Sequence, residues 1–310
     1  MKKGLLLVLV LMMVLSGAAF ANGAQEDGER PVKYALMMSH MTNAFTIALS
    51  DSVKAAAEAL GVDLVVFDGG QDVAKQISQV ESAINQRYAG IIIEPASVDG
   101  IKPAATAANR AGIPLVTINQ KITNQDLAKA FVGVKHVEGG EMEMMYAAET
   151  IGGEGKVAFL LGPLGSDAQI GRTKGYYNVL NDYPGIEVVY EQSANWRTDE
   201  ALELVENWLQ TGVELEAIVA NNDGMALGAL KAVEDARMLD KIKVFGLDAT
   251  PDALAAVGEG RLTATISQST EAQGLAAMEA LVKIVNGEEV PAEIIVDHTL
   301  ITQENVADFQ

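Results

Sequence analysis

From Val32 onward the chain alternates between two hydrophobic periods. Short runs of apolar, often β-branched residues are typical of buried strands, and longer stretches with apolar positions three or four residues apart are typical of helices. Ten such runs read KYALMM, DLVVF, GIIIE, LVTI, AFVG, KVAFLL, EVVY, AIVA, IKVFGL and TATIS. Because strands that are apolar throughout are buried on both faces, the pattern predicts α/β architecture with parallel sheets between helices. Ten strands favour two sheets over one.

The stretch DVAKQISQVESAINQR carries the helical period most clearly. Val73, Ile77, Val80 and Ile84 fall at positions i, i+4, i+7 and i+11, which predicts one buried stripe on an otherwise polar helix. The chain contains no solenoid repeat, low-complexity tract or long linker. We therefore expect two lobes joined by short crossings.

The first residues predict export. MKKGLLLVLVLMMVLSGAAFANG joins two lysines to an apolar run and then to the small-residue site AFA, the arrangement of a secretory signal peptide. We expect residues 1–21 to be cleaved and residues 22–31 to form a flexible leader of a periplasmic protein. A membrane anchor is the alternative, but spanning needs about 20 apolar residues and this run is shorter. The chain has no Cys, so lipid attachment, disulfides and cysteine-bound metals are not expected.

Charge and motifs exclude several classes of function. The 310 residues carry a formal net charge of -20, which disfavours nucleic acid and anionic membranes as partners. His40, His136 and His298 lie far apart, and no G-x-S-x-G or H-E-x-x-H motif is present. GGEGK at 152–156 lacks the Ser or Thr of a phosphate loop and precedes a strand, so we interpret it as a turn. We expect a non-enzyme without a cofactor; a glycosidase with two carboxylates in a cleft is the enzyme alternative.

Polar residues gather where predicted strands end. The run AIVA leads into Asn221, Asn222 and Asp223 and then into a helix. Ligands of open parallel sheets bind outside the carboxyl ends of the strands. Capping of the helix explains one of these residues and leaves the other two unexplained. The same habit recurs at Asn43, Phe45, Asn119, Gln120, Asp248 and Gln268.

These residue types suit a neutral polyhydroxylated ligand. Amide side chains both donate and accept hydrogen bonds, as a sugar hydroxyl does. Phe45 and Trp196 offer aromatic faces for the C–H side of a sugar ring. The pattern therefore predicts a small-molecule sugar or polyol site.

The order of TNAF, IPLVTINQ, GRTKGY, ANNDGMALGALKAV, GLDATPDALAAV and LTATISQ resembles the periplasmic ribose-binding protein family, the type I sugar-binding proteins of ABC transporters. The resemblance spans nearly the whole mature chain. It implies the type I periplasmic binding protein fold, in which two Rossmann-like lobes with parallel sheets are joined by three hinge crossings. The implied N-terminal lobe is 32–133 with 268–296, and the C-terminal lobe is 134–267 with 297–310. Hinges are expected near 132–135, Ser267 and Asp297.

The same resemblance implies a set of ligand contacts. They are Asn43, Phe45, Asn119, Gln120, Arg172, Trp196, Asn222, Asp248 and Gln268. Asn119-Gln120 stands where ribose binders have an Asp-Arg pair, and Thr46 where they have a second aromatic residue. Losing a charged donor fork and an aromatic wall points away from ribose and leaves open another pentose, a hexose, an inositol or a sugar alcohol. For Arg172, an ordinary salt bridge on the second-lobe helix is the alternative.

The resemblance also implies the partners. The chain is expected to be a monomeric, extracytoplasmic solute-binding protein that delivers its ligand to the membrane permease of an ABC importer. A sugar-sensing module for a chemoreceptor is the alternative. Sugar-responsive repressors resemble the same core, but they carry a DNA-binding helix-turn-helix where this chain has its predicted signal peptide.

Overall fold

The computed structural model describes residues 32–310, so the predicted signal peptide and leader lie outside the described residues. Its strands are β1 (Lys33–Met38), β2 (Asp63–Asp68), β3 (Gly90–Ile93), β4 (Leu115–Ile118), β5 (Ala130–Gly133), β6 (Glu154–Leu161), β7 (Gly185–Ser193), β8 (Ala217–Ala220), β9 (Lys243–Phe245), β10 (Thr265–Ser267), β11 (Glu293–Ile295) and β12 (Thr299–Ile301). Its helices are α1 (Ala44–Leu60), α2 (Val73–Asn85), α3 (Lys102–Arg110), α4 (His136–Thr150), α5 (Asp167–Leu180), α6 (Thr198–Gln210), α7 (Asp223–Asp235), α8 (Pro251–Gly258) and α9 (Thr270–Val285), with short 3-10 turns at Gln125–Leu127 and Val306–Asp308.

Two parallel sheets hold most of the strands. The six-stranded sheet has the order β11-β5-β4-β3-β1-β2, and the four-stranded sheet has the order β7-β6-β8-β9. In each sheet the first strand along the chain lies between the second and the third, so the strand order reverses beside β1 and beside β6. Such a reversal opens a crevice at the carboxyl ends of the strands, where α/β proteins bind ligands.

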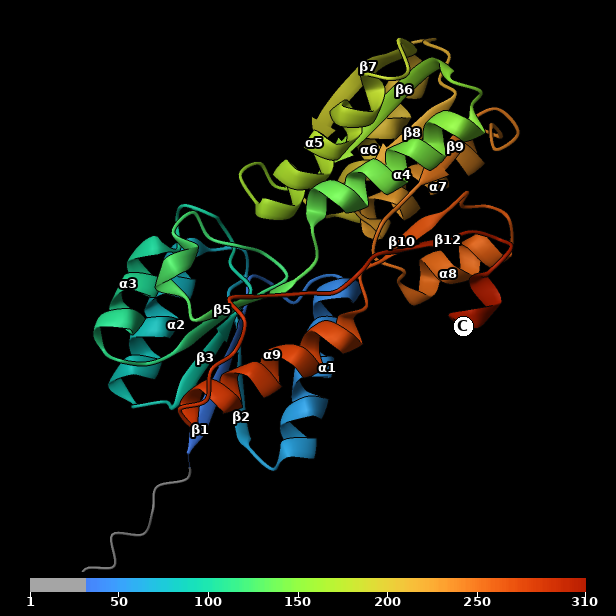
Figure 1. Ribbon diagram of the computed structural model, residues 1–310. Helices are drawn as coiled ribbons and strands as arrows, with labels where there is room; N and C mark the ends of the chain where they lie inside the picture. The colour runs from blue at the N-terminus through green and yellow to red at the C-terminus, as the bar shows by residue number, and fades with distance from the viewer. Residues whose placement is uncertain (1–31) are drawn as a thin grey trace, which may run out of the picture. The chain divides into compact units, whose positions relative to one another are not determined.

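Helices cover both faces of each sheet (Figure 1). On the six-stranded sheet, α1 and α9 pack on one face, and α2 and α3 pack on the other. On the four-stranded sheet, α6, α7 and α8 share one face, and α4 and α5 cover the other. Neighbouring residues of a strand therefore enter different cores: Leu36 packs with α1 and α9, and Met37 with α2 and α3. This explains why the strands are apolar throughout.

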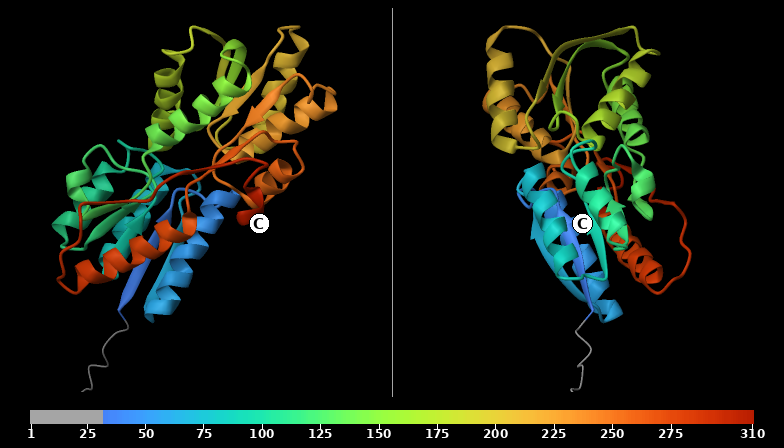
Figure 2. Two further views of the ribbon diagram at one scale, coloured as in Figure 1. Left: turned by 45° about the vertical axis from the view of Figure 1, so that its right-hand side comes forward. Right: turned by 90° about the vertical axis from the view of Figure 1, so that its left-hand side faces the viewer.

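The chain passes between the two sheets three times. It does so between β5 and α4, between β10 and α9, and between β11 and β12. Although α9 comes late in the sequence, it lies beside α1, as Figure 2 shows from two directions. The strand β11 extends the first sheet by pairing with β5, with Ile294 opposite Val132. Late segments of the chain thus complete the layer that the first residues begin.

All ten predicted strands are present, and the structure has two further strands that the sequence did not predict. The missed strands β11 and β12 have three residues each, too few to show a period. The two parallel sheets expected from the sequence are present, and β10 in addition forms an antiparallel pair with β12. The turn predicted at 152–156 is present only at Gly152 and Gly153, because β6 begins at Glu154. In α2 the predicted stripe is only partly buried, since Val80 is fully buried and Ile77 is half-buried.

Within residues 32–310, no helix combines the length and the hydropathy needed to cross a membrane.

Candidate ligand-binding site

Asn43 ends the loop after β1 and begins α1. Its Oδ1 accepts hydrogen bonds from Thr46 N at 2.9 Å and from Thr46 Oγ1 at 3.0 Å, which satisfies the first turn of the helix. The cap leaves Nδ2 as the donor end of the side chain. Phe45, two residues later, is 7% exposed.

Asn119 and Gln120 directly follow β4. Asn119 has a φ of +60°, a left-handed conformation that few residues other than glycine adopt. Its Nδ2 donates to Gln268 Oε1 at 3.1 Å and to Gln273 Oε1 at 3.4 Å, and its carbonyl oxygen lies 2.8 Å from His136 Nε2. These contacts hold the Asn119 side chain with Oδ1 as its remaining acceptor.

Arg172 lies on α5 and is 3% exposed. Its Nη1 donates to the carbonyl oxygen of Asn221 and lies 3.8 Å from Asp248 Oδ1. Its guanidinium carbon is 5.7 Å from the centre of the Trp196 ring, within the range of a cation–π contact. Arg172 therefore forms the salt bridge of the alternative interpretation, but with a residue that is itself a predicted ligand contact.

Trp196 lies in the loop between β7 and α6. It has a φ of +63°, and its neighbour Asn195 has a φ of +52°. The indole lies against Gly162, where an added Cβ would come within 2.1 Å of the ring. The indole can therefore occupy this position because Gly162 has no side chain.

The three polar residues after β8 have different structural roles. Asn222 is the cap of α7, because its Oδ1 accepts from Met225 N at 3.0 Å. Asp223 is fully buried and accepts from Thr250 N at 2.8 Å and from Thr265 Oγ1 at 2.7 Å. Asn221 accepts from Gly162 N at 3.2 Å. Asn221 and Asp223 thus hold neighbouring loops.

Asp248 and Gln268 belong to one buried network. Asp248 has a φ of +145°, and its backbone pairs with Ser267. Gln268 Nε2 donates to Asp248 Oδ1 at 2.6 Å, while Gln268 Oε1 accepts from Asn119. Gln268 thus connects the end of β4 with the end of β9.

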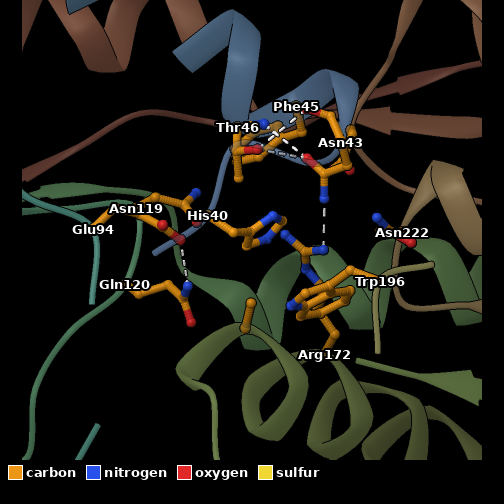
Figure 3. Close-up of a pocket in the computed structure, with 12 residues that line it drawn as sticks. His40, Asn43, Phe45, Thr46, Glu94, Asn119, Gln120, Arg172, Trp196 and Asn222 are labelled. Carbon is orange, nitrogen blue, oxygen red and sulfur yellow. Dashed lines mark hydrogen bonds and ion pairs between the residues drawn. The ribbon is translucent and has the colours of Figure 1, made fainter. Parts of the chain in front are cut away.

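Eight of the nine residues singled out from the sequence line one pocket (Figure 3). Gln268 does not line it; it is fully buried and bonds two residues that do. The pocket contains about 290 Å³ of space not occupied by atoms, which includes space open to solvent. Its walls come from loops at the carboxyl ends of both parallel sheets. Amides, a guanidinium and two aromatic rings suit a small polyhydroxylated molecule.

Sequence reasoning missed His40 and Glu94, which also line the pocket. Glu94 directly follows β3, so the rule of polar residues at strand ends could have found it. It is 2% exposed, and its Oε2 accepts from Ser39 N at 2.8 Å. His40 Nδ1 lies 2.8 Å from Thr42 Oγ1. Burial lowers the pKa of His40, against opposing fields from Glu94 and Asp68, so the ring is neutral at neutral pH.

Burial also shifts the acids around the pocket. It raises the pKa of Asp248 well above its ordinary value, although Arg172 favours the charged form. It raises the pKa of Asp223 to about 6, against the hydrogen bonds from Thr250 and Thr265. A hydrogen-bond donor on a bound ligand would stabilise the ionised form of Asp248.

The described residues contain no group of three or more His, Cys, Asp or Glu side chains placed to hold a metal ion.

Comparisons with known proteins agree with this geometry. The family model described as a periplasmic binding protein domain matches residues 34–289. A protein of Rhizobium meliloti named as rhizopine-binding is 38% identical over 256 residues, covering 81% of this chain and 83% of the relative. The ribose import binding protein of Bacillus subtilis is 32% identical over 310 residues, covering 98% of this chain and all of the relative (100%).

Solved structures give the same result. An ABC transporter solute-binding protein from Bacillus halodurans with bound myo-inositol superposes with a TM-score of 0.87 at 34% identity, covering 91% of this chain and 98% of that chain. One from Actinobacillus succinogenes with bound D-allose gives a TM-score of 0.84 at 31% identity, covering 90% and 100%. These homologues are solute-binding proteins that work outside the cytoplasm. This chain therefore belongs to the periplasmic binding proteins, among the ribose-binding-like sugar-binding proteins of ABC transporters.

Proposed function

We propose that the chain captures one monosaccharide or polyol between two lobes and presents it to the permease of an ABC importer, which is the role of its family. The observation that carries this proposal is the polar pocket whose lining comes from loops of both parallel sheets. A ligand that bridges the two sets of loops makes all its contacts only when the lobes are closed. It therefore shifts the population toward the closed state by its differential affinity.

Each wall has a role in this proposal. Asn43 and Asn222 donate through the amide ends that their capping bonds leave over. Arg172 donates and Asp248 accepts on the side of the four-stranded sheet. Phe45 and Trp196 cover the apolar faces of the ligand. Gln268 acts from behind, by holding Asn119 and Asp248 in position.

The proposed ligand class rests on the positions where the chain differs from ribose binders and on the ligands for which its relatives are named. Asn119 and Gln120 provide no cation, which separates this pocket from a ribose site with an Asp-Arg pair. Two relatives, at 38% and 37% identity, are named for rhizopine and xylitol. A solved structure with 34% identity holds myo-inositol. We place cyclitols and sugar alcohols first among the solutes.

The proposed lobes are residues 32–133 with 268–296 and 134–267 with 297–310. Sheet membership supports this division, because β11 and α9 pack with the first sheet. The three crossings fall near Val134, Ser267 and Asp297, and these segments would absorb the backbone change of closure. Export through a cleaved signal peptide and a monomeric state complete the proposal.

The test is thermal unfolding of the mature chain, purified free of ligand, against pentoses, hexoses, inositols and sugar alcohols. A ligand at about 100 times its dissociation constant adds about 2.7 kcal/mol, a shift of several degrees. We expect one solute to raise the midpoint while its stereoisomers do not. If no sugar or polyol does so with a folded, empty protein, the proposal fails. Hydrolysis of chromogenic glycosides would instead favour a glycosidase.

A further inference from the structure

One wall of the pocket carries a carboxylate without a cationic partner. Glu94 is 2% exposed and lines the pocket. Its Oε2 accepts from Ser39 N at 2.8 Å, and its Oε1 accepts from Gln120 Nε2 (Figure 3). Both donors are neutral, and Glu94 forms no salt bridge with any residue in 32–310. A buried ionised carboxylate normally requires a partner of opposite charge.

The other charged groups of the pocket lie elsewhere. Arg172 contacts Asp248 and the carbonyl oxygen of Asn221 on the side of the four-stranded sheet. Figure 3 shows the side chain of His40 between those of Glu94 and Arg172. His40 supplies no charge, because burial lowers its pKa despite the nearby carboxylates of Glu94 and Asp68. The wall formed by the six-stranded sheet therefore holds the Glu94 carboxyl group with no cation beside it.

Neighbouring side chains of this wall also offer acceptors. Gln120 turns its Nε2 toward Glu94 Oε1, which leaves Gln120 Oε1 buried without a partner. Asn119 uses its Nδ2 on Gln268 and Gln273 and keeps Oδ1 as an acceptor. A ligand hydroxyl brings one hydrogen to such a wall. A protonated amine brings three hydrogens and the missing positive charge.

Resting on the sugar- or polyol-binding function proposed above, we propose that the wall of Glu94, Gln120 and Asn119 binds a protonated primary amine. The preferred solutes are then amino-substituted cyclitols or monosaccharides rather than their hydroxyl parents. The remaining hydroxyls of such a ligand face Asn43, Arg172 and Asn222 as in the general proposal.

The experiment is calorimetric titration of the mature protein at pH 7 with matched pairs. Each pair contains a monoamino derivative of an inositol or aldohexose, with the amine at a different ring position, and its hydroxyl parent. We expect at least one amine to bind about tenfold or more tightly than its parent, the range of a charge-assisted hydrogen bond. Glu94→Gln keeps the shape and removes the charge, and should abolish this preference while the parent still binds. Asp68→Asn is the matched control, an exposed carboxylate near His40 that does not line the pocket.

A second measurement does not depend on how the variant folds. With the wild-type protein, the N-acetylated derivative of the preferred amine should lose the tenfold advantage, because it keeps the nitrogen but not the charge.

The outcomes separate the two proposals. If a parent polyol binds and no amine binds more tightly, the amine assignment is overturned and the general function stands. If an amine is preferred but Glu94→Gln or acetylation leaves the preference unchanged, the assignment to Glu94 is wrong. If neither amines nor parents bind to folded, empty protein, the sugar-binding function itself fails.

Discussion

Several residues of the pocket hold a backbone conformation that costs free energy. Asn119, Trp196 and Asp248 have φ values of +60°, +63° and +145°, and each lines the pocket. Non-glycine residues in such conformations cost on the order of 1–3 kcal/mol each and persist where surrounding contacts hold them. Here Gln268 supplies such contacts to both Asn119 and Asp248. These contacts hold the side chains in place, and a preorganised site loses less entropy on binding.

Gly162 provides a test of how Trp196 is placed. In Gly162→Ala the new Cβ would come within 2.1 Å of the indole, so the ring must move. We expect ligand affinity to fall about two- to tenfold, the worth of an aromatic contact. Emission from Trp196, recorded in a Trp208→Phe background because the chain has two Trp, should shift. The smaller ring of Trp196→Phe should reduce the penalty of the Ala. Unchanged affinity and emission would show that contact with Gly162 does not determine the position of the indole.

Arg172 is the cationic donor of the pocket and gives a second prediction. Arg172→Ala removes its hydrogen bonds and leaves Asp248 without its cation, so the free energy of ligand binding should weaken by about 1.5–3 kcal/mol. Titration calorimetry measures this directly. The control is Arg261→Ala, a partly exposed arginine that pairs with Glu234 and Glu259 and does not line the pocket. Equal affinities for both variants would restrict Arg172 to a structural salt bridge.

At the scale of elements, α4 and α5 enclose a polar pair behind the pocket. Tyr176 on α5 donates to Glu143 Oε2 on α4 at 2.6 Å, and both side chains are buried. The helices approach closely because Gly140 and Gly175 have no side chains; a Cβ at Gly175 would come within 2.4 Å of Val137 O. Burial raises the pKa of Glu143 to about 8, against the hydrogen bond from Tyr176 and the positive charge of Arg172.

This raised pKa predicts the pH dependence of stability. Below pH 4.5, the ordinary pKa, Glu143 is protonated in both the folded and the unfolded chain. Between that value and about 8 only the unfolded chain loses the proton, so stability falls as pH rises, by at most about 1.4 kcal/mol per pH unit. In urea unfolding at pH 5, 6.5 and 8, the free energy of unfolding of Glu143→Gln should rise relative to that of wild type as the pH increases. Glu149→Gln, exposed on the same helix, should run parallel to wild type. A constant difference for Glu143→Gln would contradict the raised pKa.

Elements with a clear period were predictable from the sequence, and those fixed by tertiary contact were not. Each of the first nine strands is buried on both sides or at an edge of a large sheet, so its apolar run is visible. By contrast, β11 is a strand only because β5 lies beside it. The strand-end rule found six pocket residues, while Trp196 was proposed as an aromatic face and Arg172 came from the family resemblance. None of these could reveal that Gln268 lies behind Asn119 and Asp248. Glu94 was missed because it ends an apolar run and was taken as part of it.

At the scale of the whole molecule, contacts join the proposed lobes beside the pocket. The backbone N of Lys121, after β4, donates to Asp167 Oδ2 at the start of α5 at 2.8 Å. His136 at the start of α4 contacts the carbonyl oxygen of Asn119 at 2.8 Å. The His136 contact adjoins a crossing, where the chain itself keeps the groups close. The Lys121–Asp167 contact joins residues that are 46 positions apart and depends on how the lobes meet.

Asp167 therefore tests closure as the capture mechanism. If the Lys121–Asp167 bond forms only when the lobes close, Asp167→Ala destabilises the closed state by about 1 kcal/mol, the worth of one net hydrogen bond. Apparent affinity should fall about fivefold, although Asp167 does not line the pocket. The compaction that ligand produces in small-angle X-ray scattering should need correspondingly more ligand. Glu293→Gln, which removes only the exposed ion pair with Lys121 Nζ, should leave both unchanged. If Asp167→Ala instead lowers the stability of the empty protein by the full amount at unchanged affinity, the contact is permanent and closure does not involve it.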